Sequence, residues 1–232
     1  LSFAVALDIV IAMPLSWLPL AADYSRFSKD VKKSGFGTWI GYFIVSSWMY
    51  ALGYCAAVAT GNADIVPMML ALGFSATALF IVLFSTFTTT FMDIYSSAIS
   101  TLNIFPKLGE KKGILIYGIA GTLIALVFPV TQYEFFLLMI GSVFSPLFGI
   151  VLSDYFILRK RKLEVEELYK ARESKYWYRS GVNIFAITAW VAGVAVYQLC
   201  YSYALWIGSS LPSLIIAGLL YLLLMKTKVR RD

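Results

Sequence analysis

The stretch that decides the fold is residues 74–104, FSATALFIVLFSTFTTTFMDIYSSAISTLNI, which contains a single charged residue, Asp93. A helix that crosses a membrane needs roughly 20 consecutive, mostly apolar residues, and this stretch is longer. We therefore expect one transmembrane helix that is tilted or that extends beyond the bilayer.

Similar apolar stretches recur along the chain. Residues 181–225 contain no charged residue but are too long for one span. We divide them near Tyr201–Trp206, where aromatic residues cluster as they do at a membrane interface. The sequence then predicts seven transmembrane helices, at about 1–22, 36–60, 74–104, 113–131, 135–158, 181–201 and 206–225.

The composition supports an all-α integral membrane protein. Of the 232 residues, 60% are hydrophobic and 14% are charged, whereas soluble domains contain roughly 25% charged residues. This balance excludes a soluble enzyme, a secreted disulfide scaffold and a nucleic-acid-binding domain, despite the net charge of +6. The chain contains no histidine, which excludes metal sites and acid–base chemistry that depend on that residue.

The basic residues predict the orientation in the membrane. All 19 Lys and Arg residues lie in the 23–35, 105–112 and 158–180 segments and in the tail after residue 225. The loops at 61–73, 132–134 and 202–205 contain none. Because basic loops stay in the cytoplasm, we expect a cell-membrane protein with Leu1 outside and Asp232 inside.

The chain begins Leu1-Ser2-Phe3-Ala4, without Met and without the basic region of a signal peptide. We expect a piece of a longer protein whose upstream spans are absent. Residues 159–180 form a cytoplasmic connector, which we expect to be partly helical, with Glu166 and Lys170 at i,i+4 spacing.

The first span contains a candidate break. Pro14 and Pro19 bracket Leu-Ser-Trp-Leu, and each proline removes a backbone donor and clashes with the preceding turn. Such a break is tolerated in a membrane only against protein or a water-filled cavity. We expect Ser16 and Trp17 to line a site there; the alternative is a merely kinked helix. Asp8 also lies among apolar residues of this span.

The third span contains a polar stripe. Ser85, Thr88 and Thr89 follow i, i+3, i+4 spacing, and Asp93 comes one turn later. Hydroxyl oxygens on one face above a carboxylate are suitable ligands for a small cation. Hydroxyls in membrane helices also bond to their own backbone carbonyls. However, an Asp at mid-bilayer costs about 2.5–3.5 kcal/mol, so we expect it to face a partner or a cavity.

In the fifth span the structural interpretation is favoured. Gly141, Ser145 and Gly149 form a row of small residues suited to close helix contact. Asp154 lies immediately before the basic run, and we expect it near Arg159 or Lys160. The last two spans, with few polar residues, are interpreted as scaffold.

Four segments resemble the nucleobase–cation symport family, which contains cytosine, allantoin and hydantoin permeases. They are PLSWLPLAADYSRF (14–27), FTTTFMDIYSSAIS (87–100), FSPLFGIVLSDYFILRKR (144–161) and YWYRSGVN (176–183). The first is most similar to a branch described as hydroxymethylpyrimidine (thiamine precursor) transporters.

The resemblance implies a fold and a site. It implies the twelve-span, five-plus-five inverted repeat of the leucine-transporter fold, with this chain matching spans six to twelve. Residues 1–158 would be the second repeat, with its first span broken, and 181–232 two trailing helices and a basic tail. It further implies sodium ligands at Ser85, Thr88 and Thr89 and substrate contacts at Ser16, Trp17 and Asp93.

The implied activity is sodium- or proton-coupled uptake of a pyrimidine-type nucleobase or thiamine precursor, without an organic cofactor. The chain departs from the family at Phe87, where many members have Trp, and at Thr90–Asp93, where many have an Asn-rich run. A carboxylate accepts hydrogen bonds but cannot donate them. Asp93 therefore favours an aminopyrimidine over a uracil-like ring.

Two other classes compete. A seven-helix receptor or sensor has the same topology, although residues 206–225 lack the Lys that a retinal protein needs. An intramembrane aspartyl protease would have to use Asp8, Asp93 or Asp154.

Overall fold

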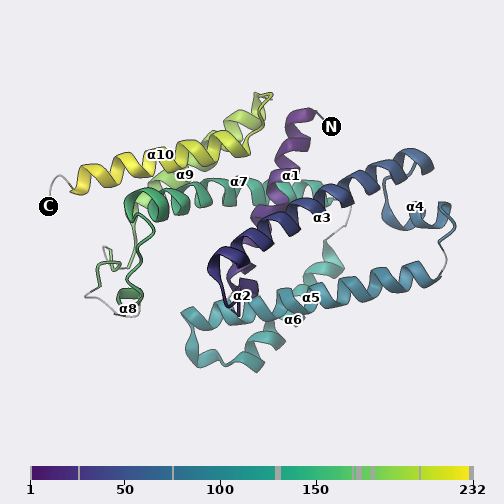
Figure 1. The fold of residues 1–232 in the computed structure, drawn as a ribbon, viewed down its shortest axis with the longest axis horizontal. Helices are drawn as coiled ribbons and strands as arrows, with labels where there is room; N and C mark the ends of the chain where they lie inside the picture. The colour runs from purple at the N-terminus through teal and green to yellow at the C-terminus, as the bar shows by residue number, and fades with distance from the viewer. Residues whose placement is uncertain are drawn as a thin grey trace. The chain divides into compact units, whose positions relative to one another are not determined.

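The computed structural model describes residues 2–25, 27–74, 76–128, 132–168, 170, 174–178, 181–203 and 205–229, which form helices and connecting loops (Figure 1). The longer helices are α1 (Phe3–Trp17), α3 (Val31–Thr60), α5 (Ala76–Ile104), α6 (Glu110–Val127), α7 (Tyr133–Leu152), α9 (Ile184–Ser202) and α10 (Ser210–Val229). Shorter elements are the 3₁₀ turns η1 (Leu18–Leu20) and η2 (Pro106–Leu108), the helices α2 (Ala21–Ser25), α4 (Ile65–Ala71) and α8 (Val165–Leu168), and the π-helical segment η4 (Ser153–Leu158).

Within the described residues, five helices are long and apolar enough to cross a membrane. They cover Phe3–Leu20, Val31–Thr60, Ala78–Ile104, Tyr133–Leu158 and Ile184–Ser202. The other two predicted positions hold α6, which begins with Glu110-Lys111-Lys112, and α10, whose apolar part is the shorter Ser210–Lys226. In the described part of the chain a helix is thus present at each of the seven predicted positions, and five of these helices are both long and apolar enough to cross a membrane. The predicted division near Tyr201–Trp206 is confirmed, because α9 ends at Ser202 and α10 begins at Ser210.

The chain folds as two compact units. One contains Leu1–Pro19 and Pro129–Asp232, and the other contains Leu20–Phe128. These two units are defined by the contacts between residues in the structure. The predicted division into a repeat, a connector and trailing helices rests instead on the family resemblance and stays a prediction.

In the first unit, α7 packs against α1, α9 and α10 (Figure 1). The predicted small-residue row is confirmed as a packing surface, because Gly141, Ser145 and Gly149 are all buried. Glycine is needed at the contact with α10, since a Cβ atom on Gly149 would overlap the backbone of Leu214. Without side chains at the crossing, two helix backbones approach closely and gain dispersion contacts.

In the second unit, α5 and α6 form a helical hairpin joined by η2. Ala98 is fully buried against Gly113, whose Cβ position lies 3.1 Å from the Ala98 Cβ atom. The hydroxyls of Thr101 and Tyr117 are hydrogen-bonded across the same interface. The apolar α3 has no buried side chain among the described residues, so its surface is available to lipid or to other protein segments.

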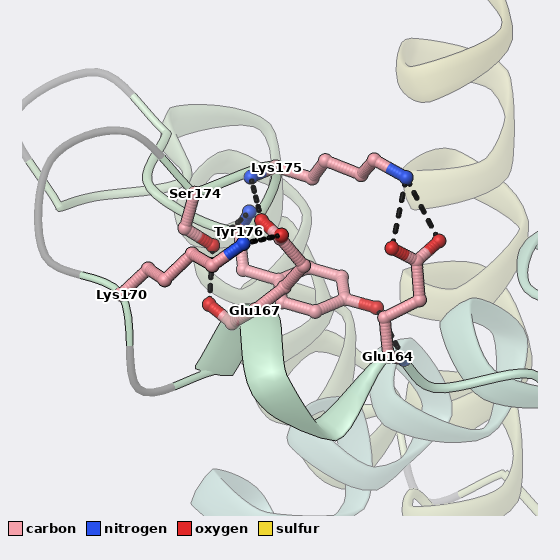
Figure 2. Close-up of polar contacts among 6 residues, drawn as sticks. All are labelled: Glu164, Glu167, Lys170, Ser174, Lys175 and Tyr176. Atoms are coloured by element: carbon pink, nitrogen blue, oxygen red, sulfur yellow. Dashed lines mark hydrogen bonds and ion pairs between the residues drawn. The ribbon is translucent and has the colours of Figure 1, made fainter.

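The connector is partly helical, as predicted, but its ion pair differs from the prediction. Lys170 Nζ lies 2.6 Å from Glu167 Oε1, one residue after the expected partner Glu166 (Figure 2). The reason is that α8 ends at Leu168, so the i,i+4 geometry does not extend to Lys170. The Lys175 ammonium also lies 2.8 Å from the Glu164 carboxylate, and this second ion pair links the two ends of the connector segment 164–175.

Candidate functional site

The C-terminal end of α1 carries the first group of predicted site residues. The α-helix continues through Pro14 as far as Trp17, and the backbone changes to the 3₁₀ turn η1 at Leu18–Leu20. The change in geometry therefore falls at the end of the predicted break rather than across all of it. Pro19 lies inside this turn, where its lack of an N–H group costs least because the α-helical ladder has already ended.

Ser16 and Trp17 are both half-buried. The Ser16 hydroxyl donates a hydrogen bond of 2.7 Å to the Met13 carbonyl oxygen. That bond satisfies its proton locally and leaves the oxygen lone pairs able to accept from another group. Trp17 is the last residue of the α-helix.

The second group lies on α5. Thr88 and Thr89 both donate to the carbonyl oxygen of Ser85, at 2.8 and 3.1 Å. This is the local bonding that membrane helices commonly show. This bonding is also compatible with a cation site. When a hydroxyl donates its proton to a backbone carbonyl, its oxygen lone pairs point away from that bond and can coordinate an ion. The three hydroxyl-bearing residues are exposed within their unit.

Asp93 lies one helical turn after Thr89 and is exposed within its unit. Its backbone carbonyl accepts a hydrogen bond of 2.7 Å from the Ser97 hydroxyl. Three residues further on, Ser96 is fully buried, and its hydroxyl has no hydrogen-bond partner among the described residues. Helical periodicity thus brings Ser85, Thr88, Thr89 and Asp93 together on α5.

Ser16 and Trp17 belong to one compact unit, and the α5 residues belong to the other. The joint action of the two groups on one substrate therefore stays a prediction.

Asp8 has no place in the transport site predicted from the sequence. The structure buries its side chain to 1% exposure and pairs it with the backbone N–H groups of Ser209 and Ser210. The available signal was a carboxylate in an apolar span together with the Gly-Ser-Ser sequence that starts a later helix. Neither feature identifies its partner alone.

The prediction that Asp154 pairs with the following basic run is confirmed. Its carboxylate forms an ion pair with Arg159 and accepts a hydrogen bond of 2.8 Å from the Tyr221 hydroxyl. Arg159 in turn donates to the Tyr178 hydroxyl at 2.9 Å. Burial lowers the pKa of Arg159, but the hydrogen bond and charge of Asp154 outweigh burial, so the pKa is raised and the guanidinium stays charged. This network joins η4, the connector and α10.

Comparison with known proteins gives a match over almost the whole chain. The sequence model of one family, described as "Permease for cytosine/purines, uracil, thiamine, allantoin", matches residues 2–214. No solved structure matches the chain at a significant level.

Several curated relatives are similar to parts of the chain. Cytosine permease of Escherichia coli (strain K12) is 30% identical over 161 residues, which is 69% of this chain and 38% of the relative. Allantoin permease of Bacillus subtilis (strain 168) is 32% identical over 108 residues, covering 45% of this chain and 22% of the relative. Hydantoin permease of Microbacterium maritypicum is 30% identical over 105 residues, covering 45% and 21%.

The chain therefore spans well under half the length of these relatives. The match is to permeases, so neither a seven-helix receptor nor an intramembrane protease is favoured. Together with the five long apolar helices, it identifies an integral membrane protein.

Proposed function

Because the chain belongs to the nucleobase–cation symport family, a family of permeases, we propose that it is part of a secondary active transporter. The transporter takes up a pyrimidine-type nucleobase, or a thiamine precursor such as hydroxymethylpyrimidine, together with sodium. The observation that carries this proposal is the family match over residues 2–214, which includes the hydroxyl and carboxylate face of α5.

The architecture we propose follows the resemblance. The chain supplies spans six to twelve of a leucine-transporter fold: a second five-span repeat over 1–158, a connector over 159–180, and two trailing helices with a basic tail over 181–232. The connector and the C-terminus lie in the cytoplasm, since the positive-inside rule assigns basic loops to that side. Upstream spans of the full-length protein supply the remaining parts of the site.

We assign the sodium ion to Ser85, Thr88 and Thr89. Sodium is a hard cation that prefers oxygen ligands, and this face of α5 offers hydroxyls within one turn of each other. The protons of Thr88 and Thr89 already point to the Ser85 carbonyl. Their lone pairs can therefore coordinate an ion without breaking those bonds.

We assign substrate recognition to Asp93, with Ser16 and Trp17. An ionised carboxylate accepts hydrogen bonds from ring N–H and amino groups, so Asp93 selects an aminopyrimidine edge. A planar ring is held well by an aromatic face, which is the role of Trp17, while polar groups such as Ser16 fix its rotation in the plane.

The proposal is tested by equilibrium binding to the full-length protein purified in detergent. Radiolabelled aminopyrimidine binding is measured in sodium and in an equal concentration of choline, with uracil as the competing ring. We expect binding that sodium strengthens and that uracil competes for weakly. Absence of binding for every pyrimidine, with and without sodium, would overturn the assignment of substrate class.

A further inference from the structure

A buried carboxylate ties the first helix of this chain to its last. The Asp8 side chain accepts from the Ser209 N–H at 2.9 Å (Oδ1) and 2.8 Å (Oδ2), and from the Ser210 N–H at 2.7 Å (Oδ1). Asp8 is 1% exposed, Ser209 2% and Ser210 fully buried. These are short, charge-assisted hydrogen bonds in a site that excludes water.

These hydrogen bonds satisfy backbone N–H groups at the start of α10. The first N–H groups of a helix have no partner inside the helix, and α10 has no acidic residue in its first turn. Other helices use a neighbouring residue: Ser2 caps α1, Asp30 caps α3 and Asn183 caps α9. For α10 the capping carboxylate comes from α1, about 200 residues away in sequence.

The loop before α10 is shaped around this carboxylate. Gly208 has a φ of +73°, and a Cβ atom there would lie 2.8 Å from Asp8 Oδ1. Only glycine combines this backbone conformation with such a close approach. The positive end of the α10 dipole offsets the cost of burying the charge of Asp8.

Asp8 also lies on the buried face of α1, which consists of Ala4, Asp8, Ala12 and Leu15. Ser16 follows Asp8 by eight residues, which is about 12 Å along the helix axis. Apolar contacts permit a helix to slide or rotate, whereas directed hydrogen bonds from the two backbone N–H groups of Ser209 and Ser210 fix both its height and its rotation.

We propose that Asp8 is a positioning residue for transport: it anchors α1 to the N-terminus of α10 and thereby sets the position of the substrate-contacting end of α1. The inference rests on the proposed function, which assigns Ser16 and Trp17 to the substrate. It also gives the trailing helix α10 a part in recognition beyond scaffolding.

The test uses Asp8→Asn in the full-length transporter. Asparagine keeps the shape of the side chain but replaces one acceptor oxygen with an NH₂ donor that faces the Ser209 N–H. The matched control is Asp30→Asn, because Asp30 caps α3 through an exposed hydrogen bond of 2.8 Å to the Lys33 N–H. Gly208→Ala disturbs the same contact from the α10 side and serves as the second variant.

Two quantities are measured. The first is deuterium exchange of the amides in residues 205–213 of the purified protein. The second is the KM and the maximal rate of radiolabelled aminopyrimidine uptake in cells, per transporter molecule at the surface. We expect Asp8→Asn to speed exchange and to raise KM about tenfold, as loss of a charged hydrogen bond implies, with little change in maximal rate. Gly208→Ala should act in the same direction, and Asp30→Asn should change neither quantity.

The outcomes separate the two proposals. Unchanged exchange in Asp8→Asn would overturn the anchoring role. Faster exchange with an unchanged KM and fewer transporters at the surface would show that Asp8 only stabilises the fold, which also overturns the inference. A wild-type protein without pyrimidine uptake would instead overturn the proposed function, because the exchange measurement does not depend on substrate.

Discussion

Gly149 of α7 lies directly against Leu214 of α10, so close that a Cβ atom on the glycine would overlap the leucine carbonyl oxygen. The neighbouring atoms belong to the backbone of a helix, which cannot rotate away as a flexible side chain can. The α7–α10 contact therefore requires glycine at this position.

Gly149→Ala is expected to destabilise the protein by about 1–3 kcal/mol or more, the range for overpacking a well-packed interior. Gly35→Ala is the matched control, because no atom outside its own stretch of helix lies within 4 Å of its Cβ position. Thermal unfolding of the full-length protein in detergent measures both. Equal unfolding temperatures would show that α7 and α10 do not approach as closely as described.

The sequence predicted the helices well because the signal is local. Apolar length marks a span, and the spacing of Gly141, Ser145 and Gly149 marks a packing surface, so both could be read without knowing any partner. The pairing of Asp154 with Arg159 was predictable for the same reason, since five positions separate them.

Contacts that depend on the three-dimensional fold were not predictable. No periodicity in the sequence connects Asp8 with Ser209, and the choice between Glu166 and Glu167 depends on where α8 ends. The sequence also left undecided whether α1 continues as a helix through Pro14, because a proline kinks some membrane helices and interrupts others. Joint action of Ser16, Trp17 and Asp93 on one substrate is still a prediction.

The connector offers a direct comparison of the predicted and observed ion pairs. Glu167→Gln removes the negative charge and leaves only one of the two oxygens that accept from the Lys170 side chain and the Lys175 N–H. It should therefore speed tryptic cleavage within the connector. Trypsin should cleave the control variant Glu166→Gln, one residue earlier, at the wild-type rate. The opposite order would support the pairing of Glu166 with Lys170.

The same contacts set a pH range for the connector. The hydrogen bond from Lys170 lowers the pKa of Glu167 below its ordinary value of 4.5. The stability that the Glu167 carboxylate gives to the connector is therefore fully present above that value. It is lost as the pH falls through the lowered pKa. The hydrogen bond to Glu164 raises the pKa of Lys175 above 10.5. The stability from the Lys175–Glu164 ion pair is therefore lost only as the pH rises through this raised pKa. A titration of the Glu167 carboxyl carbon by NMR should show a midpoint below 4.5.

Thr89→Ala should raise the sodium concentration needed for half-maximal uptake about tenfold, equivalent to 1.4 kcal/mol. Ser100→Ala is the control on the same helix. Sodium dependence of uptake by the full-length protein distinguishes the two residues. Equal effects would mean that the hydroxyls only bond to their own backbone, as Thr88 and Thr89 do with Ser85.

Asp93→Asn should change which pyrimidine is preferred without abolishing folding. The amide keeps the shape of the side chain, removes the charge and adds a donor. We expect competition by uracil to strengthen relative to competition by cytosine, about tenfold in the ratio of inhibition constants. An unchanged ratio with normal surface expression would remove Asp93 from the recognition site.

The most direct measurement is uptake of radiolabelled aminopyrimidine by liposomes that contain the full-length protein, with and without an inward sodium gradient. Sodium-coupled transport predicts accumulation above the external concentration when the gradient is present, and loss of that accumulation when a sodium ionophore collapses the gradient. Accumulation that is the same without sodium, or no uptake of any pyrimidine by protein that is folded and correctly inserted, would contradict sodium-coupled pyrimidine transport.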